Sequence, residues 1–316
     1  MAEKKTIAVI GATGAQGGGL VQAILADDAG AVAARAITRN PDSDNAQALA
    51  AAGAEVVAGD SDDDASLERA FAGAHGVFCV TNFWEHHSPE RELAQAANLA
   101  RAAKAAGVAH VVWSTLEDTR TWVPLDDDRV PTLQGKYKVP HFDAKGEADS
   151  IFREESAPTT FLRAAFYWDN FVSFGMGPRR AEDGTLTLAL PLGGAKLPGV
   201  AVKDIGRCAY GIFKRGPAMA GRYVGVAGDV LTGPQMAAAF TRALGRTVTF
   251  SDIPFEVYRN LGFPGADDLA NMFQVQALFE EQFCKNRDVA QSRALNPELS
   301  SLDAWLADNA GRIPIG

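Results

Sequence analysis

Short apolar runs alternate with amphipathic, alanine-rich segments along the first half of the chain. Buried β-strands are expected at residues 7–10, 32–38, 55–58, 76–80, 110–114 and 159–162. Helices are expected at residues 20–26, 46–52, 67–72, 89–106 and 141–153. Alternation of this kind is typical of a parallel sheet with helices on both faces. It predicts a doubly wound, Rossmann-type α/β fold.

The pattern changes beyond residue 165, where glycine and proline become frequent. Short strands are expected there at residues 186–190, 200–202 and 223–226, and helices at residues 233–244, 255–261 and 302–309. We expect a nucleotide-binding domain over residues 1–165 and a smaller, partly interleaved C-terminal lobe for substrate or partner over residues 166–316. A proline- and aspartate-rich segment at 116–140 is expected to be a long loop, and loops of this length often act as lids.

Glycines stand at positions 11, 14 and 17, directly between the first strand and the first helix. Gly11 suits a tight turn, Gly14 a close approach of pyrophosphate to the backbone, and Gly17 the close packing of helix on strand. The N-terminus of the following helix would face the phosphates. The spacing is G-x-x-G-x-x-G, a variant of the usual fingerprint, and it predicts a dinucleotide-binding site.

The residue that closes the second strand indicates which dinucleotide is bound. Arg39 stands about 20 residues beyond the glycines, where an acidic residue would bind the ribose 2′-hydroxyl of NAD and an arginine suits the 2′-phosphate of NADP. A guanidinium can form a forked, charge-assisted contact with phosphate. Asp42 and Asp44 place negative charge close by, so NAD(H) remains an alternative to the favoured NADP(H).

Composition and charge exclude several classes of function. The chain has 316 residues and a net charge of −9, which argues against a nucleic-acid-binding surface because such surfaces are basic. No apolar run approaches the roughly 20 residues of a membrane span, and no signal peptide is expected. The three cysteines are far apart, and no Cys/His spacing suits a metal. We expect a cytoplasmic protein without a metal site; a homo-oligomer is left open.

Candidate catalytic residues lie in and after the strand at 110–114. Ser114 ends this strand, and His141 and Lys145 are spaced so that they share one helical face. The arrangement resembles the Ser and Tyr-x-x-x-Lys pattern of short-chain dehydrogenases/reductases, with His141 in place of the tyrosine. In that chemistry the lysine holds the nicotinamide ribose and the tyrosine donates a proton. A histidine can also donate a proton near neutral pH, although a packing role for His141 is nearly as good an interpretation.

Polar and aromatic residues after other strands complete the candidate site. Asp60 follows the third strand, where it could meet the adenine, and Asn82 follows the fourth, where it could line the nicotinamide crevice. The substrate cleft is expected to include Phe83, Trp84, Tyr167, Asn170 and Tyr258. Glu85, His86 and His87 are adjacent, but no further ligand completes a metal site, so the histidines are interpreted as loop residues.

Several of these motifs together resemble the NmrA-like family of atypical short-chain dehydrogenases. They are GATGAQG at 11–17, TRNP at 38–41, GD at 59–60, VTNFWE at 80–85 and HFDAKGE at 141–147. The segment LGFPGADDLANMF at 261–273 is similar to the C-terminal part of a human member, an NADP(H)-binding redox sensor. The resemblance implies a Rossmann domain with a small lobe and NADP(H) contacted by Thr13, Gly14, Gln16, Arg39, Asp60, Asn82 and Lys145.

Two functions are compatible with this resemblance. Family members lack the catalytic tyrosine, and some bind other proteins according to nicotinamide state, which implies a cytoplasmic redox sensor or regulator with a protein partner. The alternative is an NADPH-dependent reductase of a small carbonyl, quinone or imine acceptor, with Lys145, Ser114 and His141 in catalysis. The human-type sequence has basic residues after the Arg-Asn-Pro, whereas Asp42 and Asp44 follow it here, and this departure bears on NADP selectivity.

Overall fold

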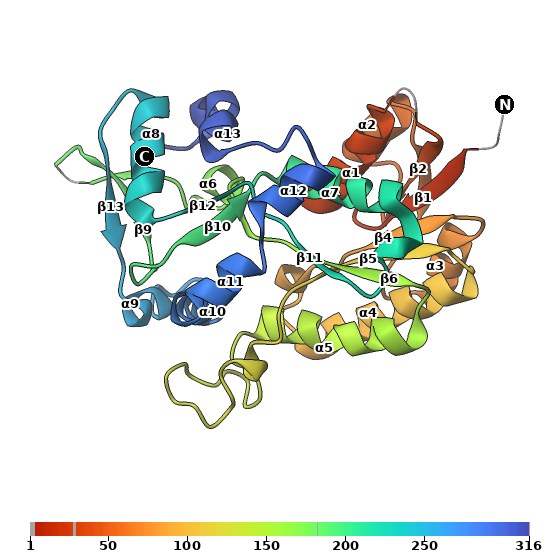
Figure 1. Ribbon diagram of the computed structural model, residues 1–316, viewed down its shortest axis with the longest axis horizontal. Helices are drawn as coiled ribbons and strands as arrows, with labels where there is room; N and C mark the ends of the chain where they lie inside the picture. Colours follow the sequence, from red (N-terminus) through yellow and green to blue (C-terminus); the bar gives the residue numbers. More distant parts are fainter. Residues whose placement is uncertain (1–3, 28–29, 182, 316) are drawn as a thin grey trace. The chain divides into compact units, whose positions relative to one another are not determined.

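The computed structural model describes residues 4–27, 30–181 and 183–315, which form two compact units (Figure 1). The first unit comprises the described residues up to Asp118 together with His141–Arg163 and Val202–Val224. The second comprises Thr119–Pro140, Ala164–Ala201 and the described residues from Gly225 onward. Each unit is therefore assembled from three separate stretches of chain. Within the described ranges, no helix combines the length and apolar character needed to cross a membrane.

The first unit is built around a seven-stranded sheet with the order β11-β6-β5-β4-β1-β2-β3. Its strands are β1 (Lys5–Val9), β2 (Val32–Thr38), β3 (Glu55–Ala58), β4 (Gly76–Cys79), β5 (His110–Thr115), β6 (Thr159–Arg163) and β11 (Tyr223–Gly225). Neighbouring strands from β1 to β6 pair in parallel. The strand order reverses between β1 and β4, which confirms the predicted doubly wound fold.

Helices cover both faces of this sheet. They are α1 (Ala15–Leu25), α2 (Asp44–Ala51), α3 (Asp64–Phe71), α4 (Pro89–Ala105), α5 (Pro140–Glu155) and α7 (Val202–Arg215). Figure 1 shows α3, α4 and α5 along one face and α1 and α7 along the other. The core on the first face includes Phe71 from α3, Leu99 from α4 and Phe152 from α5, and the Phe152 ring stacks on Trp113 of β5 with the ring centroids 4.4 Å apart.

Side-chain caps explain where several helices begin. The side chains of Ser43, Asp63 and Ser88 accept hydrogen bonds from backbone N–H groups in the first turns of α2, α3 and α4. Pro89 occupies the first helical position of α4, where its missing N–H costs nothing. The expected start of this helix at Ser88-Pro89 is confirmed.

The helix α7 was not predicted, and the strand expected at 200–202 is wrong. The strand β10 (Leu197–Val200) ends where that run begins, and α7 starts at Val202, so one apolar run spans the junction of the two elements. α7 packs closely on α1 through glycines. A Cβ on Gly206 would lie 2.8 Å from the Cα of Gly19, so the two helix backbones leave no space for a side chain at this crossing.

The second unit contains two three-stranded sheets. One has the order β12-β10-β7 and the other β13-β9-β8. Besides β10, their strands are β7 (Phe166–Tyr167), β8 (Arg179–Arg180), β9 (Leu186–Leu190), β12 (Asp229–Leu231) and β13 (Val248–Asp252). The helices are α6 (Asn170–Ser173), α8 (Gly233–Leu244), α9 (Phe255–Arg259), α10 (Ala266–Leu278), α11 (Glu280–Lys285), α12 (Val289–Leu295) and α13 (Leu302–Asn309). The expected bounds of α8, α13 and β9 are confirmed.

The loop before α5 belongs to the second unit and is held there by hydrogen bonds. The buried Nζ of Lys138 donates hydrogen bonds to the carbonyl oxygens of Asp127 and Val130, both at 2.8 Å. From α10, Nδ2 of Asn271 donates to the carbonyl oxygens of Pro131 and Lys138 at 2.8 and 2.6 Å. The loop is therefore fixed by buried polar contacts, and its function as a lid stays a prediction.

Candidate functional site

The glycine turn lies where the strand order of the sheet reverses, the place where doubly wound folds bind ligands. Gly11 follows β1 with φ +64, a value that favours glycine, and Gly14 is the N-cap of α1. A Cβ on Gly17 would lie 2.7 Å from the carbonyl carbon of Gly11, so helix and turn can approach this closely only with glycine. Because a glycine caps it, α1 begins without the side-chain acceptor that caps α2, α3 and α4.

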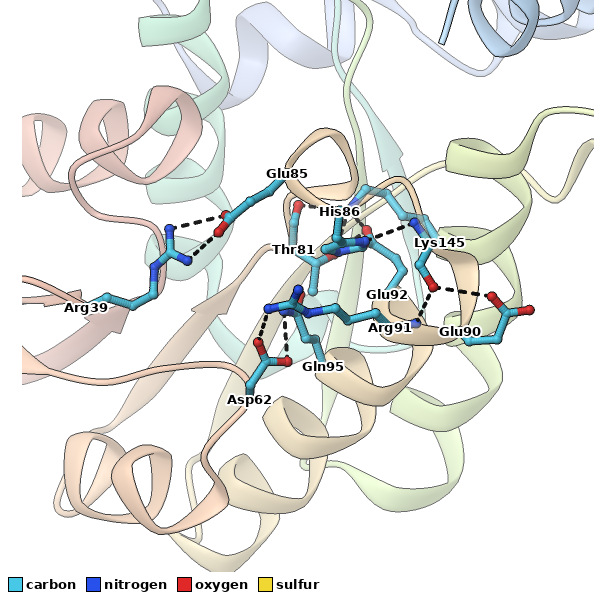
Figure 2. A network of polar contacts seen from close by, with 11 residues as sticks. Arg39, Asp62, Thr81, Glu85, His86, Glu90, Arg91, Glu92, Gln95 and Lys145 are labelled. Atoms are coloured by element: carbon cyan, nitrogen blue, oxygen red, sulfur yellow. Dashed lines mark hydrogen bonds and ion pairs between the residues drawn. The ribbon is translucent and has the colours of Figure 1, made fainter. Parts of the chain in front are cut away.

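Arg39 follows the end of β2 and forms a forked ion pair with Glu85 (Figure 2). Its Nη2 lies 3.2 Å from Oε2 of Glu85, and its Nη1 contacts Oε1. Glu85 ends η1 (Phe83–Glu85), the short 3-10 helix after β4. The hydrogen bonds of the pair raise the pKa of Arg39 and lower the pKa of Glu85, so both groups stay charged.

Lys145 lies in α5 and is bound to residues after β4 and in α4. Its Nζ is 2.6 Å from Oε1 of Glu92, and it donates hydrogen bonds to Oγ1 and the backbone oxygen of Thr81 at 2.7 and 3.1 Å. The hydroxyl of Thr81 in turn donates to Oε1 of Glu92 at 2.6 Å. An ammonium group has three N–H donors, and the ammonium of Lys145 is surrounded by three acceptor oxygens, one from Glu92 and two from Thr81.

Glu92 is the buried counter-ion of the network, and its side chain is fully shielded from solvent. Burial alone opposes its ionisation, but the charge of Lys145 and the surrounding donors lower its pKa to about 2. The Nε2 of His86 faces its second oxygen at 3.3 Å, while Nδ1 of His86 accepts from the backbone N–H of Ser88. His86 therefore lines this network (Figure 2).

Ser114 and Gln16 are brought together, since the Ser114 hydroxyl donates to Oε1 of Gln16 at 2.8 Å. Gln16 belongs to the first turn of α1, so this bond joins the end of β5 to the glycine turn. Asp60 and Asn82 follow β3 and β4 at the carboxyl edge of the sheet, and Asn82 is exposed. The Asp60 carboxylate accepts from the backbone N–H of Asp62 at 3.0 Å.

His141 is packed among aromatic rings of its own unit. Its ring lies 4.7 Å from that of Trp84 and 6.0 Å from that of Phe83, measured between centroids. The His141 residue is 6% exposed, and Trp84 is 38% exposed. The histidine therefore lies behind a partly exposed indole. This position agrees with the packing interpretation, and it also suits a His141 that donates a proton beside the Trp84 ring.

The other three expected cleft residues belong to the second unit. Tyr167 lies in β7, Asn170 begins α6, and Tyr258 is buried against the rings of Phe263 and Phe273. Burial raises the pKa of Tyr258 to about 12, which keeps its hydroxyl protonated.

Two important acidic residues were missed from the sequence. Glu92 is one, and Asp149 is the other; its carboxylate accepts hydrogen bonds from Trp113, Thr115 and Tyr223 at 3.0, 2.6 and 2.7 Å. Asp149 follows Lys145 by four residues, so the helical spacing that singled out Lys145 also indicates an acidic residue on the same face. For Glu92 the signal was weaker, because an acid in the first turn of a helix is usually explained by the helix dipole.

Comparisons with known proteins agree with this architecture. The sequence profile of the NmrA-like family matches residues 3–306. An NmrA-like family domain-containing oxidoreductase from Aspergillus versicolor is 31% identical over 259 residues, 75% of this chain and 68% of that protein. Another from Aspergillus sp. (strain MF297-2) is 32% identical over 265 residues, 78% of this chain and 75% of that protein.

Solved structures are similar over nearly the whole chain. NmrA, a negative transcriptional regulator, in complex with NADP has a TM-score of 0.79 at 25% identity, covering 97% of this chain and 95% of that one. The complex of NmrA with NAD has the same TM-score of 0.79. With a matching profile over most of its length and relatives above 30% identity, this chain belongs to the NmrA-like family.

Proposed function

We propose that the first unit binds a nicotinamide dinucleotide and prefers NADP(H) to NAD(H). The turn from Gly11 to Gly17 fits the pyrophosphate, because its glycines leave the backbone open and α1 begins without a side-chain acceptor. Thr13 and Gln16 belong to this turn, and Arg39 would hold the 2′-phosphate. The complexes of NmrA with NADP and with NAD support a site of this class.

The remaining contacts in this proposal come from the ends of neighbouring strands. Asp60 and Asn82 would contact the cofactor, and Lys145 would hold the nicotinamide ribose. In this scheme residues 1–165 form most of the nucleotide-binding domain, and residues 166–316 form most of the lobe for substrate or partner. The two are partly interleaved, because residues 119–140 belong to the second unit and residues 202–224 to the first. In that lobe the substrate cleft would be lined by Tyr167, Asn170 and Tyr258.

The chain is proposed to act as a cytoplasmic redox sensor or regulator. One observation carries this choice: the Lys145 ammonium is already surrounded by Glu92 and two oxygens of Thr81. A catalytic lysine must also lower the pKa of the neighbouring acid through its positive charge, and here the buried carboxylate of Glu92 balances that charge. With His141 in place of the tyrosine as well, the site favours binding over turnover.

The test is a titration of the purified protein with NADPH and with NADP⁺, followed by turnover assays against quinones, aldehydes, ketones and imines. We expect NADPH to bind without being oxidised, and the protease-cleavage pattern or the oligomeric state to differ between the two forms of the cofactor. Binding that changes neither shape, oligomeric state nor partner binding would contradict the sensor. Sustained oxidation of NADPH would favour an enzyme.

A reductase is the second candidate, and the partly exposed Trp84 ring beside His141 supports it. The relatives from Aspergillus are also named oxidoreductases. Bound NADPH would supply the hydride, Lys145 would orient its ribose and His141 would hold the proton. Lys145→Ala should then abolish turnover, while Lys104→Ala, an exposed lysine of α4, should not. Unchanged turnover in Lys145→Ala would refute the assigned site.

A further inference from the structure

The guanidinium of Arg39 already has a carboxylate partner at the place assigned to a phosphate. Both nitrogens of its fork contact the two oxygens of Glu85, which is the geometry by which arginine binds carboxylate and phosphate alike. The side chains of Arg39 and Glu85 remain 60% and 40% exposed. The pair is therefore open to solvent and can be separated by a ligand.

Glu85 comes from a different part of the chain than the acidic residue that usually binds the ribose 2′-hydroxyl in this fold. An acid that reads the ribose 2′-hydroxyl ordinarily follows β2 itself, where this chain has Arg39. Here the acid follows β4, on the other side of β1 in the sheet. The two side chains thus meet across β1, which lies between β2 and β4 in the sheet.

Other acids add to the negative charge around the guanidinium. Asp60 and Asp62 both act electrostatically on Arg39, in the same direction as Glu85, although the charge of Asp62 is partly balanced by Arg91, whose Nη2 lies 2.6 Å from Oδ2 of Asp62 (Figure 2). A 2′-phosphate arriving at Arg39 would meet this negative charge as well as the arginine. The phosphate carries close to two negative charges near neutral pH, so the repulsion is larger for it than for a hydroxyl.

We propose that Glu85 is a specificity-determining residue. It competes with the 2′-phosphate for Arg39 and thereby lowers the ratio of the affinity for NADP(H) to the affinity for NAD(H). The inference rests on the proposed cofactor site. For NADP(H) to bind, Glu85 must leave the guanidinium and turn away from the phosphate. For NAD(H), the carboxylate stays on Arg39, and its remaining acceptor capacity serves the ribose 2′-hydroxyl.

The experiment compares the affinities of wild type, Glu85→Gln, Arg39→Gln and Glu90→Gln for NADPH and NADH by isothermal titration calorimetry. Glu85→Gln removes the charge with little change of shape, and we expect NADPH affinity to rise about three- to fivefold. NADH affinity should fall a few-fold. Glu90→Gln removes the same charge from an exposed position in α4, and we expect it to leave the ratio of the two affinities unchanged.

Arg39→Gln distinguishes a failure of this inference from a failure of the proposed cofactor site. If Arg39→Gln weakens NADPH binding but Glu85→Gln leaves the NADPH/NADH affinity ratio within about twofold of wild type, the Glu85 inference is overturned and the cofactor site stands. If wild type binds neither nucleotide, or Arg39→Gln does not affect NADPH, both are overturned. Urea unfolding midpoints equal to wild type would confirm that the exposed-site variants are folded.

Discussion

The Nζ atom of Lys145 lies 2.6 Å from Oε1 of Glu92, whose side chain is completely buried. Replacing Glu92 with glutamine would leave the ammonium of Lys145, whose side chain is only 11% exposed, without its counter-ion. Breaking a buried pair in this way typically costs several kcal/mol. We expect Glu92→Gln to lower the free energy of unfolding by roughly 3–5 kcal/mol in urea denaturation at neutral pH.

Two controls separate the charge effect from packing. Glu90→Gln in the same helix is exposed and should change stability by less than about 0.5 kcal/mol. The double variant Glu92→Gln/Lys145→Met removes both charges, and it should recover a large part of the loss. If Glu92→Gln is as stable as Glu90→Gln, the buried pair does not stabilise the unit.

Asp149 is expected to make the stability of the protein depend on pH in the direction opposite to that of an ion-paired carboxylate. Burial raises its pKa to about 6, against the hydrogen bonds from Thr115, Tyr223 and Trp113, which lower it. Since this value is above the 3.8 of an unperturbed aspartate, the fold favours the protonated form. Its contribution to stability is present at low pH and is lost as the pH rises from about 4 through about 6.

Asp149→Asn should remove this dependence. The amide stays neutral, so the unfolding free energy of the variant relative to wild type should increase by roughly 2 kcal/mol between about pH 4.5 and pH 7. Urea denaturation at several pH values measures the difference. A flat difference for Asp149→Asn would contradict the assigned pKa.

At the crossing of α1 and α7, adding a single methyl group is expected to lower the stability of the protein strongly. Gly206→Ala would place a Cβ 2.8 Å from the Cα of Gly19, and the helices would have to separate. We expect a loss of about 1–3 kcal/mol in unfolding free energy. Gly311→Ala is the matched control, because nothing lies within 4 Å of its Cβ position. Equal stability of the two variants would show that the crossing is adaptable.

The loop before α5 should become more sensitive to protease when its two bonds to Asn271 of α10 are removed, although Gln274 of α10 still donates to the carbonyl oxygen of Arg129. Asn271→Ala deletes the hydrogen bonds to the carbonyl oxygens of Pro131 and Lys138, leaving two acceptors without their donor. Trypsin cleavage after the exposed Arg129 should accelerate about tenfold or more. Gln282→Ala removes an exposed bond in α11 and serves as the control. An unchanged cleavage rate in Asn271→Ala would mean that other contacts hold the loop.

The sequence predicted well the features that depend on near neighbours. The strand at 32–38 follows from its mostly apolar run, and the start of α4 follows from Ser88-Pro89. The contacts of Arg39 and Lys145 could not be predicted, because their partners lie far away in sequence. Arg39 and Glu85 are 46 positions apart, and they meet only because β2 and β4 flank β1. Sequence spacing identifies such residues as candidates but does not show what neutralises them.

The folding of the first unit depends on a late part of the chain. The polypeptide passes between the units after residues 118, 140, 163, 201 and 224. β6 is complete at residue 163, but α7, which covers α1, ends only at residue 215. At a usual synthesis rate the ribosome needs roughly 3–10 seconds for the residues between. During that interval a nascent chain carries an almost complete sheet on which α1 still lacks the cover of α7, so an apolar surface that is buried in the folded protein is open to contact with other chains.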